Sequence, residues 1–175
     1  AISARSTKSQ MSESNQILEL QIGDAEQMHE LGIRLAKEFR AGDLVILVGP
    51  LGAGKTTLTR GIGEGLHAIG NVSSPTFVIA RTHERENTHV PMVHVDAYRL
   101  GSAEELDDLD IDFENSIVLV EWGKGMLDGV SDNWLEIEIA RDAATEVIAT
   151  DGEEIDENRE VRITGFGPRW KSVTF

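Results

Sequence analysis

Gly49-Pro50-Leu51-Gly52-Ala53-Gly54-Lys55-Thr56 is the stretch of this chain that decides its fold. It fits the pattern G-x-x-x-x-G-K-[ST] of a phosphate-binding loop, called Walker A. Residues 44–48, Leu-Val-Ile-Leu-Val, precede the loop as a short apolar run and predict a buried strand. After the loop, Leu58, Ile62 and Leu66 recur at helical spacing. Strand, glycine loop and helix, in this order, form the context in which the pattern binds phosphate.

The residue types of the loop suit an anion. Glycines let the backbone approach phosphate closely, so that successive N–H groups point at its oxygens. The helix that begins near Lys55 adds the positive end of its dipole. We expect Lys55 to reach the β- and γ-phosphates of a nucleotide and the Thr56 hydroxyl to bind Mg²⁺. The alternative is a glycine turn that precedes Lys-Thr by chance.

Two carboxylates follow apolar runs that predict neighbouring strands. Glu121 comes directly after residues 117–120, and Asp96 comes directly after residues 92–95. The carboxyl ends of parallel strands form the sheet edge where ligands bind, and Mg²⁺ prefers oxygen ligands. We therefore expect Glu121 to hold the metal or position water, and Asp96 to support the metal shell or align the attacking water. The alternative for each is an acid that only ends a strand.

Further candidates carry a weaker signal. Thr76, in a Ser-Pro-Thr-Phe stretch, would reach the γ-phosphate or metal as part of a switch loop, or would lie in a rigid turn. Arg99 would steady phosphate charge or pair with Asp96. His94 alternates with valines and is expected to be a buried strand histidine rather than a catalyst. Trp122 is expected near the nucleotide or the sheet edge.

The pattern along the chain predicts an α/β fold. Asp24 is expected to cap a helix over 24–40, with Gln27 completing a capping box. A second helix is expected to reach residue 67 and a short third one to span 102–109. Strands are expected at 76–81, 92–95 and 117–120, around 135–139 and around 161–163, with a turn at 84–88. Apolar strands among helices indicate a P-loop NTPase-like three-layer domain, with a mostly parallel central sheet flanked by helices.

Length and composition limit the remaining possibilities. With 175 residues and 40% hydrophobic residues, the chain suggests one domain, expected over 17–175 after a disordered tail at 1–16. Met11 is a candidate natural start within that tail. The chain has no cysteine, which excludes disulfides and thiolate sites. No apolar run approaches the roughly 20 residues needed to span a bilayer, so we expect no membrane association.

The net charge of −15 argues against a free-standing nucleic-acid binder. Acidic residues cluster at 104–114 and at 151–160. They are interpreted as solvated surfaces, with docking of the first run on a basic partner as the sharper alternative. A guanine-reading N-K-x-D motif is absent, which disfavours a GTPase. An arginine-rich lid, which many small-molecule kinases need, is absent as well.

The ordered motifs resemble the TsaE family, also called YjeE. They are the loop 51–57, Ser-Pro-Thr-Phe at 74–77, His-Val-Asp-Ala-Tyr-Arg-Leu at 94–100, Glu-Glu-Leu at 104–106 and Val-Glu-Trp at 120–122. The similarity runs over about residues 22–139. Two departures are Pro50, where the family usually has an acid, and Phe77, where tyrosine is common.

The resemblance implies an ATPase that is required for the threonylcarbamoyl modification of tRNA adenosine. It implies ATP and Mg²⁺ as ligands, TsaB and TsaD as partner subunits, and a cytoplasmic location. By position, Lys55 binds phosphates, Thr56 and Glu121 hold Mg²⁺, and Asp96 supports hydrolysis, so that Lys55, Asp96 and Glu121 are the catalytic candidates. The other nucleotide-binding candidates are Gly52, Ala53, Gly54, Thr57, Thr76 and Trp122.

Two other functions stay open on the residues alone. A small-molecule P-loop kinase would transfer phosphate to an acceptor other than water. A nucleotide-gated binding module would use occupancy to control assembly, with incidental turnover. The acidity of the chain favours a partner that holds the tRNA, rather than direct tRNA binding.

Overall fold

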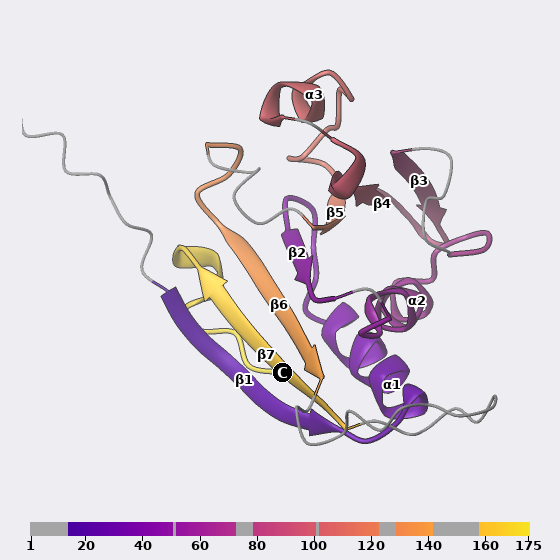
Figure 1. Cartoon of the computed structure of the whole chain (residues 1–175). Coiled ribbons are helices and arrows are strands. Elements are labelled where there is room, and N and C mark those ends of the chain that lie inside the picture. Colours follow the sequence, from indigo (N-terminus) through magenta and orange to yellow (C-terminus); the bar gives the residue numbers. More distant parts are fainter. Residues whose placement is uncertain (1–13, 51, 73–78, 101, 123–128, 142–157) are drawn as a thin grey trace, which may run out of the picture.

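The computed structural model describes residues 14–50, 52–72, 79–100, 102–122, 129–141 and 158–175. One sheet of seven strands crosses the molecule in the order β1-β7-β6-β2-β5-β4-β3 (Figure 1). The strands are β1 (Ser14–Ile22), β2 (Leu44–Val48), β3 (Ala80–Arg85), β4 (Thr88–Asp96), β5 (Ile117–Glu121), β6 (Trp134–Arg141) and β7 (Arg159–Phe166).

The centre of the sheet is parallel, as the sequence predicts. β2 pairs in parallel with β5 on one side and with β6 on the other, and β4 pairs in parallel with β5. Both edges of the sheet are antiparallel. At one edge β3 pairs with β4 as a hairpin, and at the other β7 pairs antiparallel with both β6 and β1. The continuous apolar runs of β2 and β5 therefore lie in the middle, where a strand is covered on both faces.

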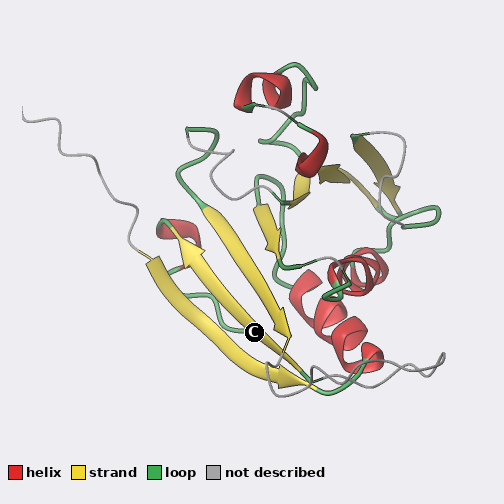
Figure 2. Cartoon of the chain, viewed as in Figure 1, coloured by secondary structure: helices red, strands yellow, loops and turns green. Residues whose placement is uncertain are grey.

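Helices cover the two faces of the sheet unequally (Figure 2). α1 (Ala25–Ala36) and α2 (Lys55–Gly65) pack side by side on one face, over the larger part of the hydrophobic core. The second face carries the shorter α3 (Ala103–Asp107) and the 3₁₀ turn η1 (Ala97–Arg99), with a smaller apolar cluster beneath them. This arrangement is the three-layer α/β domain that the sequence predicts.

The start of α1 agrees with the sequence, but its end does not. Asp24 accepts a hydrogen bond from the backbone N–H of Gln27 at 2.8 Å, and Oε1 of Gln27 accepts one from the N–H of Gly23 at 2.9 Å. The helix ends at Ala36, four residues before the expected position. The carboxylate of Asp43 accepts a bond from the N–H of Arg40 at 2.8 Å, and such a local turn competes with the helical backbone pattern.

Other expected boundaries also need correction. β1 begins at Ser14, inside the tail expected at 1–16. β3 runs to Arg85, past the expected strand 76–81, whose first residues lie outside the described part. The hairpin turn is only residues 86–87, and Asn87 adopts a φ of 63° there, in the left-handed region that asparagine tolerates. α2 and α3 each end two residues before their expected ends.

A final 3₁₀ turn, η3 (Pro168–Trp170), follows β7 and packs against the segment between α1 and β2. Trp170 is fully buried and meets Phe39 edge to face at 6.2 Å between ring centroids. Arg169 donates from Nε to Asp43 Oδ1 at 2.9 Å, which ties this turn to the residue before β2. No helix among the described residues is both long and apolar enough to cross a membrane.

Candidate nucleotide-binding site

The candidate site lies where the central parallel strands end. Glu121 is the last residue of β5 and Asp96 the last residue of β4, and the two are register partners. Side chains alternate between the faces of a strand. Met92 and Leu119 belong to the core under α1 and α2, and Asp96 and Glu121 share their parity. Both expected carboxylates therefore lie side by side, on the face of the sheet from which α2 begins.

The phosphate loop has the backbone that its glycines permit. Gly52 and Gly54 have φ values of 76° and 110°, in the left-handed region that favours glycine. Gly54 is the N-cap of α2 and has no side chain to occupy the space before the helix. The N–H of Ala53 donates to the carbonyl of Pro50 at 3.1 Å and closes a tight turn. Proline at position 50 is therefore compatible with the turn, because it supplies only the acceptor.

Lys55 is folded back onto its own loop. Its Nζ donates to the carbonyls of Gly49 and Pro50 at 2.6 and 3.0 Å, and the residue is only 6% exposed. Burial lowers the pKa of Lys55, and the carboxylates of Glu121 and Asp96 oppose part of that shift. The structure therefore brings together the three residues that the sequence marks as catalytic candidates.

The first turn of α2 carries the two threonines of the motif. Thr56 and Thr57 are both half-buried, at the end of the helix that faces the loop. Thr56 lies directly after Lys55 in the first turn of α2, next to the phosphate loop. Among the described residues no group of three or more His, Cys, Asp or Glu gathers into a metal cage. A site for Mg²⁺ that uses phosphate oxygens and waters needs only one or two protein carboxylates, which suits this donor set.

Trp122 covers the lysine. Nζ of Lys55 lies 3.9 Å from the centroid of the Trp122 ring, within the range of a cation–π contact. The same ring meets the exposed ring of Tyr98 at 5.7 Å. Trp122 has a φ of 64°, unusual for a bulky residue, while its N–H donates to the carbonyl of Leu47. Trp122 directly follows β5 and therefore lies at the sheet edge, one of the two expected positions, while its place beside a nucleotide stays a prediction.

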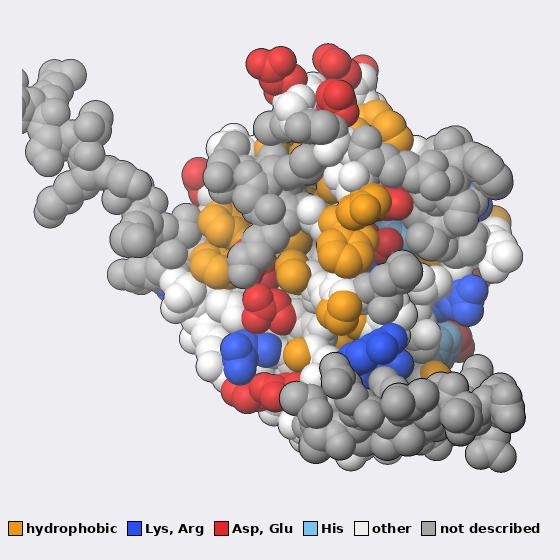
Figure 3. All heavy atoms as spheres, in the orientation of Figure 1, with side chains coloured by type: hydrophobic (Ala, Val, Ile, Leu, Met, Phe, Trp, Pro, Cys, Tyr) orange, Lys and Arg blue, Asp and Glu red, His pale blue; other side chains and the backbone are white. Residues whose placement is uncertain are grey.

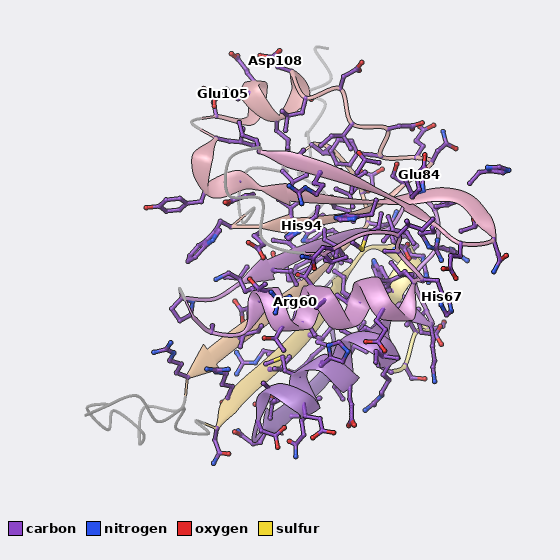
Figure 4. The ribbon with its side chains drawn as sticks, turned by 90° about the vertical axis from the view of Figure 1, so that its right-hand side faces the viewer. Arg60, His67, Glu84, His94, Glu105 and Asp108 are labelled. Atoms are coloured by element: carbon purple, nitrogen blue, oxygen red, sulfur yellow. The ribbon has the colours of Figure 1, made fainter. Side chains whose placement is uncertain are left out.

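His94 lies directly beneath Glu121. Its Nε2 is 3.3 Å from Glu121 Oε1, and their side chains are 0% and 5% exposed. Figure 4 shows His94 within the molecule, between α2, which carries Arg60, and the end that carries Glu105 and Asp108. Burial on a strand is what the sequence predicts for this histidine. Sequence reasoning missed the contact of His94 with Glu121. Alternation along β4 places His94 on the same face as Asp96, and Asp96 is the register partner of Glu121.

Of three further candidate side chains, the structure describes only that of Asp96. Asp96 is half-exposed, and its Oδ1 accepts a bond from the N–H of Tyr98 at 3.1 Å, which caps η1. Thr76 lies outside the described residues, as does the side chain of Arg99. Their expected roles therefore stay predictions.

Sequence reasoning missed two arginines beside the loop. Arg141 ends β6, Arg159 begins β7, and the two are register partners. A Cβ atom built on Gly52 would lie 2.7 Å from Nη2 of Arg141, and one built on Gly54 would lie 3.4 Å from Nη1 of Arg159. The signal that could have found them is weak, namely a basic residue at the end of one predicted strand and at the start of the next.

The acidic run at 104–114 begins on α3, at the end of the molecule away from α1 (Figure 4). Residues 104, 105, 107 and 108 on and after α3 are exposed, and Figure 3 shows the acidic side chains gathered there. Glu105 and Asp108 stand at the end away from α1 in Figure 4. Most of the second run, residues 151–157, lies outside the described part.

Comparison with known proteins gives consistent matches. A family model described as "Threonylcarbamoyl adenosine biosynthesis protein TsaE" matches residues 22–148. A Streptomyces coelicolor protein named tRNA threonylcarbamoyladenosine biosynthesis protein TsaE is 52% identical over 149 residues, covering 83% of this chain and 95% of its own. A Bacillus subtilis protein of the same name is 34% identical over 137 residues, covering 77% of each chain.

A solved structure supports the fold. A crystal structure of YdiB from Bacillus subtilis superposes with a TM-score of 0.64 at 29% identity, covering 93% of both chains. The shared architecture is a P-loop NTPase-like α/β domain. Because the family match covers well over half of the residues, this chain belongs to the TsaE family of threonylcarbamoyl adenosine biosynthesis proteins.

Proposed function

We propose that this protein binds ATP with Mg²⁺ and hydrolyses it as an accessory ATPase of tRNA threonylcarbamoyladenosine biosynthesis, acting with TsaB and TsaD in the cytoplasm. The observation that carries the proposal is the convergence of Lys55, Asp96 and Glu121 on one edge of the sheet, beside a glycine loop that opens α2. The family membership supplies the pathway.

The fit of these residues to a nucleotide follows from their chemistry. Lys55 is the cation of the loop, and its carbonyl partners at Gly49 and Pro50 can be exchanged for phosphate oxygens. The N–H groups around Gly54 point forward from the helix start, as an anion requires. Glu121 Oε1 is buried without a hydrogen-bond partner among the described residues, so a further donor or a cation would stabilise it.

The roles of the side chains divide accordingly. Thr56 and Glu121 would hold Mg²⁺, which when bound neutralises charge that develops on the phosphates. Asp96, half-exposed beside Glu121, would align the attacking water and take part in its deprotonation. Trp122 would cover the lysine side of the site and exclude water from it. The exposed acids of α3 fit the proposal that a partner, rather than this chain, holds the tRNA.

The test is ATP hydrolysis by the purified chain, alone and then with TsaB, TsaD and tRNA. We expect turnover to rise with the partners and to vanish in Lys55→Ala. Lys37→Ala is the matched control, since Lys37 follows α1 and is exposed. Turnover that is equal with and without the partners, or that rises only with a metabolite acceptor, would contradict the accessory role and favour a kinase.

A second measurement separates catalysis from gating. Asp96→Asn and Glu121→Gln are expected to stop hydrolysis and, with it, the modification of tRNA by the reconstituted system. Modification that persists at the normal rate in these hydrolysis-dead variants would show that nucleotide occupancy alone suffices. In that case the protein is a nucleotide-gated binding module.

A further inference from the structure

The ends of β6 and β7 place two arginines against the phosphate loop, on the side away from the carboxylates. β2 leads into the loop and has β5, with Glu121, as one neighbour and β6, with Arg141, as the other. β7 runs antiparallel to β6, so Arg159 at its start lies opposite Arg141 at the same edge of the sheet. The loop therefore has acids along one flank and guanidinium groups along the other.

The contacts with the loop are close. Nη2 of Arg141 occupies the space next to Gly52, where a Cβ atom would lie only 2.7 Å away. Nη1 of Arg159 approaches Gly54 in the same way, at 3.4 Å from where a Cβ would stand. These are the two glycines with positive φ whose neighbouring N–H groups form the anion cradle. An anion in the cradle would therefore lie within reach of at least one guanidinium group.

The electrostatics of this pair also point to an anionic ligand. Arg159 Nε is buried and has no hydrogen-bond partner among the described residues. By contrast, Arg162 on the same strand lies near three carboxylates, those of Glu19, Glu138 and Glu160, at 3.3 to 4.0 Å. Among the described residues, acids therefore surround the arginine that faces solvent, while the buried Nε of Arg159 beside the loop has no partner.

We propose that Arg141 and Arg159 bind the nucleoside diphosphate part of the nucleotide, the portion that ATP and ADP share. The inference rests on the proposed function, which assigns the terminal phosphate to the flank of Lys55, Asp96 and Glu121. The nucleoside-bearing end must then extend to the other flank, where the arginines lie. A guanidinium group suits that end, because it donates in a planar fork to phosphate and also stacks on aromatic rings.

The pair therefore determines affinity for both nucleotides rather than the rate of the chemical step. It also gives the protein a means to retain ADP after hydrolysis, since the contacts do not depend on the terminal phosphate.

The test is direct titration of ADP and of ATP into the full chain, with dissociation constants for wild type, Arg141→Ala, Arg159→Ala and the double variant. Loss of charge-assisted hydrogen bonds predicts roughly tenfold weaker binding of both nucleotides by the double variant. In hydrolysis assays the loss falls on KM, while kcat at saturating ATP changes far less. Arg162→Ala is the matched control, because it removes the same charge from β7 and is expected to bind both nucleotides as wild type does.

The outcomes separate the inference from the proposed function. If wild type binds neither ADP nor ATP, the proposed function fails and the inference fails with it. If wild type binds both and the double variant binds them equally well, only the inference is wrong. A loss confined to ATP, or an equal loss in Arg162→Ala, would also overturn it. Thermal unfolding without ligand checks folding, and Arg141→Gln with Arg159→Gln repeats the test if the alanine variants unfold.

Discussion

Nε2 of His94 lies 3.3 Å from Oε1 of Glu121, and both side chains are buried under the carboxyl end of β5. Neither atom makes a well-aligned hydrogen bond with the described residues. Unpaired buried polar atoms cost free energy, so a slight rotation that joins the two would stabilise the site. His94 is thereby placed to orient the carboxylate that the proposed function assigns to Mg²⁺.

His94→Asn is expected to weaken the use of Mg²⁺. Removing a residue that orients a metal ligand typically costs tenfold or more in metal affinity, so the Mg²⁺ concentration for half-maximal hydrolysis should rise roughly tenfold. His83→Asn is the matched control, because His83 is also buried but contacts the carbonyl of Ile69, away from the loop. Identical Mg²⁺ dependence in the two variants would show that His94 only fills space.

Trp122 is expected to report nucleotide binding. Its ring faces Nζ of Lys55 at 3.9 Å, and phosphate oxygens that draw the ammonium group forward would change the surroundings of the indole. Addition of ADP should therefore alter the tryptophan fluorescence of the wild type and leave that of Trp122→Phe unchanged. Trp134→Phe should keep the signal, since Trp134 stacks on Phe166 at the far end of β6. A signal that survives in Trp122→Phe would contradict the assignment.

The sequence predicted the centre of this fold because local chemistry dictates it. The loop geometry follows from its glycines. The continuous apolar runs of β2 and β5 can be buried on both faces only in the middle of a sheet. Asp96 and Glu121 were placed correctly because each directly follows such a run, and parallel strands end at one edge. The role assigned to Thr76 stays a prediction, because that residue lies outside the described part.

What the sequence did not reveal depends on contacts between distant segments. β1 is an edge strand with many polar residues, and its order comes from pairing with β7, more than a hundred positions later. Arg141 and Arg159 carry no motif, and only the hairpin of β6 and β7 brings them to the loop. The contact between His94 and Glu121 requires the register of β4 against β5, which no local pattern specifies.

Arg169→Ala is expected to destabilise the fold through Asp43. The carboxylate of Asp43 is nearly buried, and Arg169 donates to it from Nε at 2.9 Å and from Nη2 at 3.1 Å. Removing one partner of a buried pair leaves an uncompensated charge, so the free energy of unfolding should fall by about 3 kcal/mol. Arg162→Ala, which breaks only exposed pairs, should cost less than about 1 kcal/mol. Chemical denaturation of both variants measures the difference, and equal losses would contradict the argument.

Gly32→Ala is expected to push α1 away from α2. A Cβ atom at Gly32 would lie 2.5 Å from the carbonyl oxygen of Leu58 and 2.7 Å from the nitrogen of Ile62, so backbone atoms would have to shift. Overpacking of this kind costs about 1–3 kcal/mol, which outweighs the gain of about 1 kcal/mol in helix propensity. Gly23→Ala is the control, because its nearest neighbour is the flexible end of Gln27 at 3.4 Å. A more stable Gly32→Ala protein would show that the helices separate without cost.

Lys55 links nucleotide binding to pH. In the folded protein without nucleotide, burial lowers the pKa of Lys55 below its ordinary value of 10.5, so the unfolded chain holds this proton more tightly than the folded one. Linkage then requires that the contribution of Lys55 to folding stability increases as pH rises through the folded pKa, up to about 10.5. Below that pH range, Lys55 is charged in the folded protein, and the burial of its ammonium group destabilises the fold.

Phosphate beside Lys55 reverses the direction of the pKa shift, because an anion favours the ammonium form. Binding of ADP at alkaline pH should therefore take up protons, and the uptake should grow from neutral pH toward the folded pKa. Calorimetric titrations in two buffers of different ionisation enthalpy measure the protons exchanged. Binding that releases protons, or that exchanges none across the alkaline range, would show that Lys55 does not meet the phosphates.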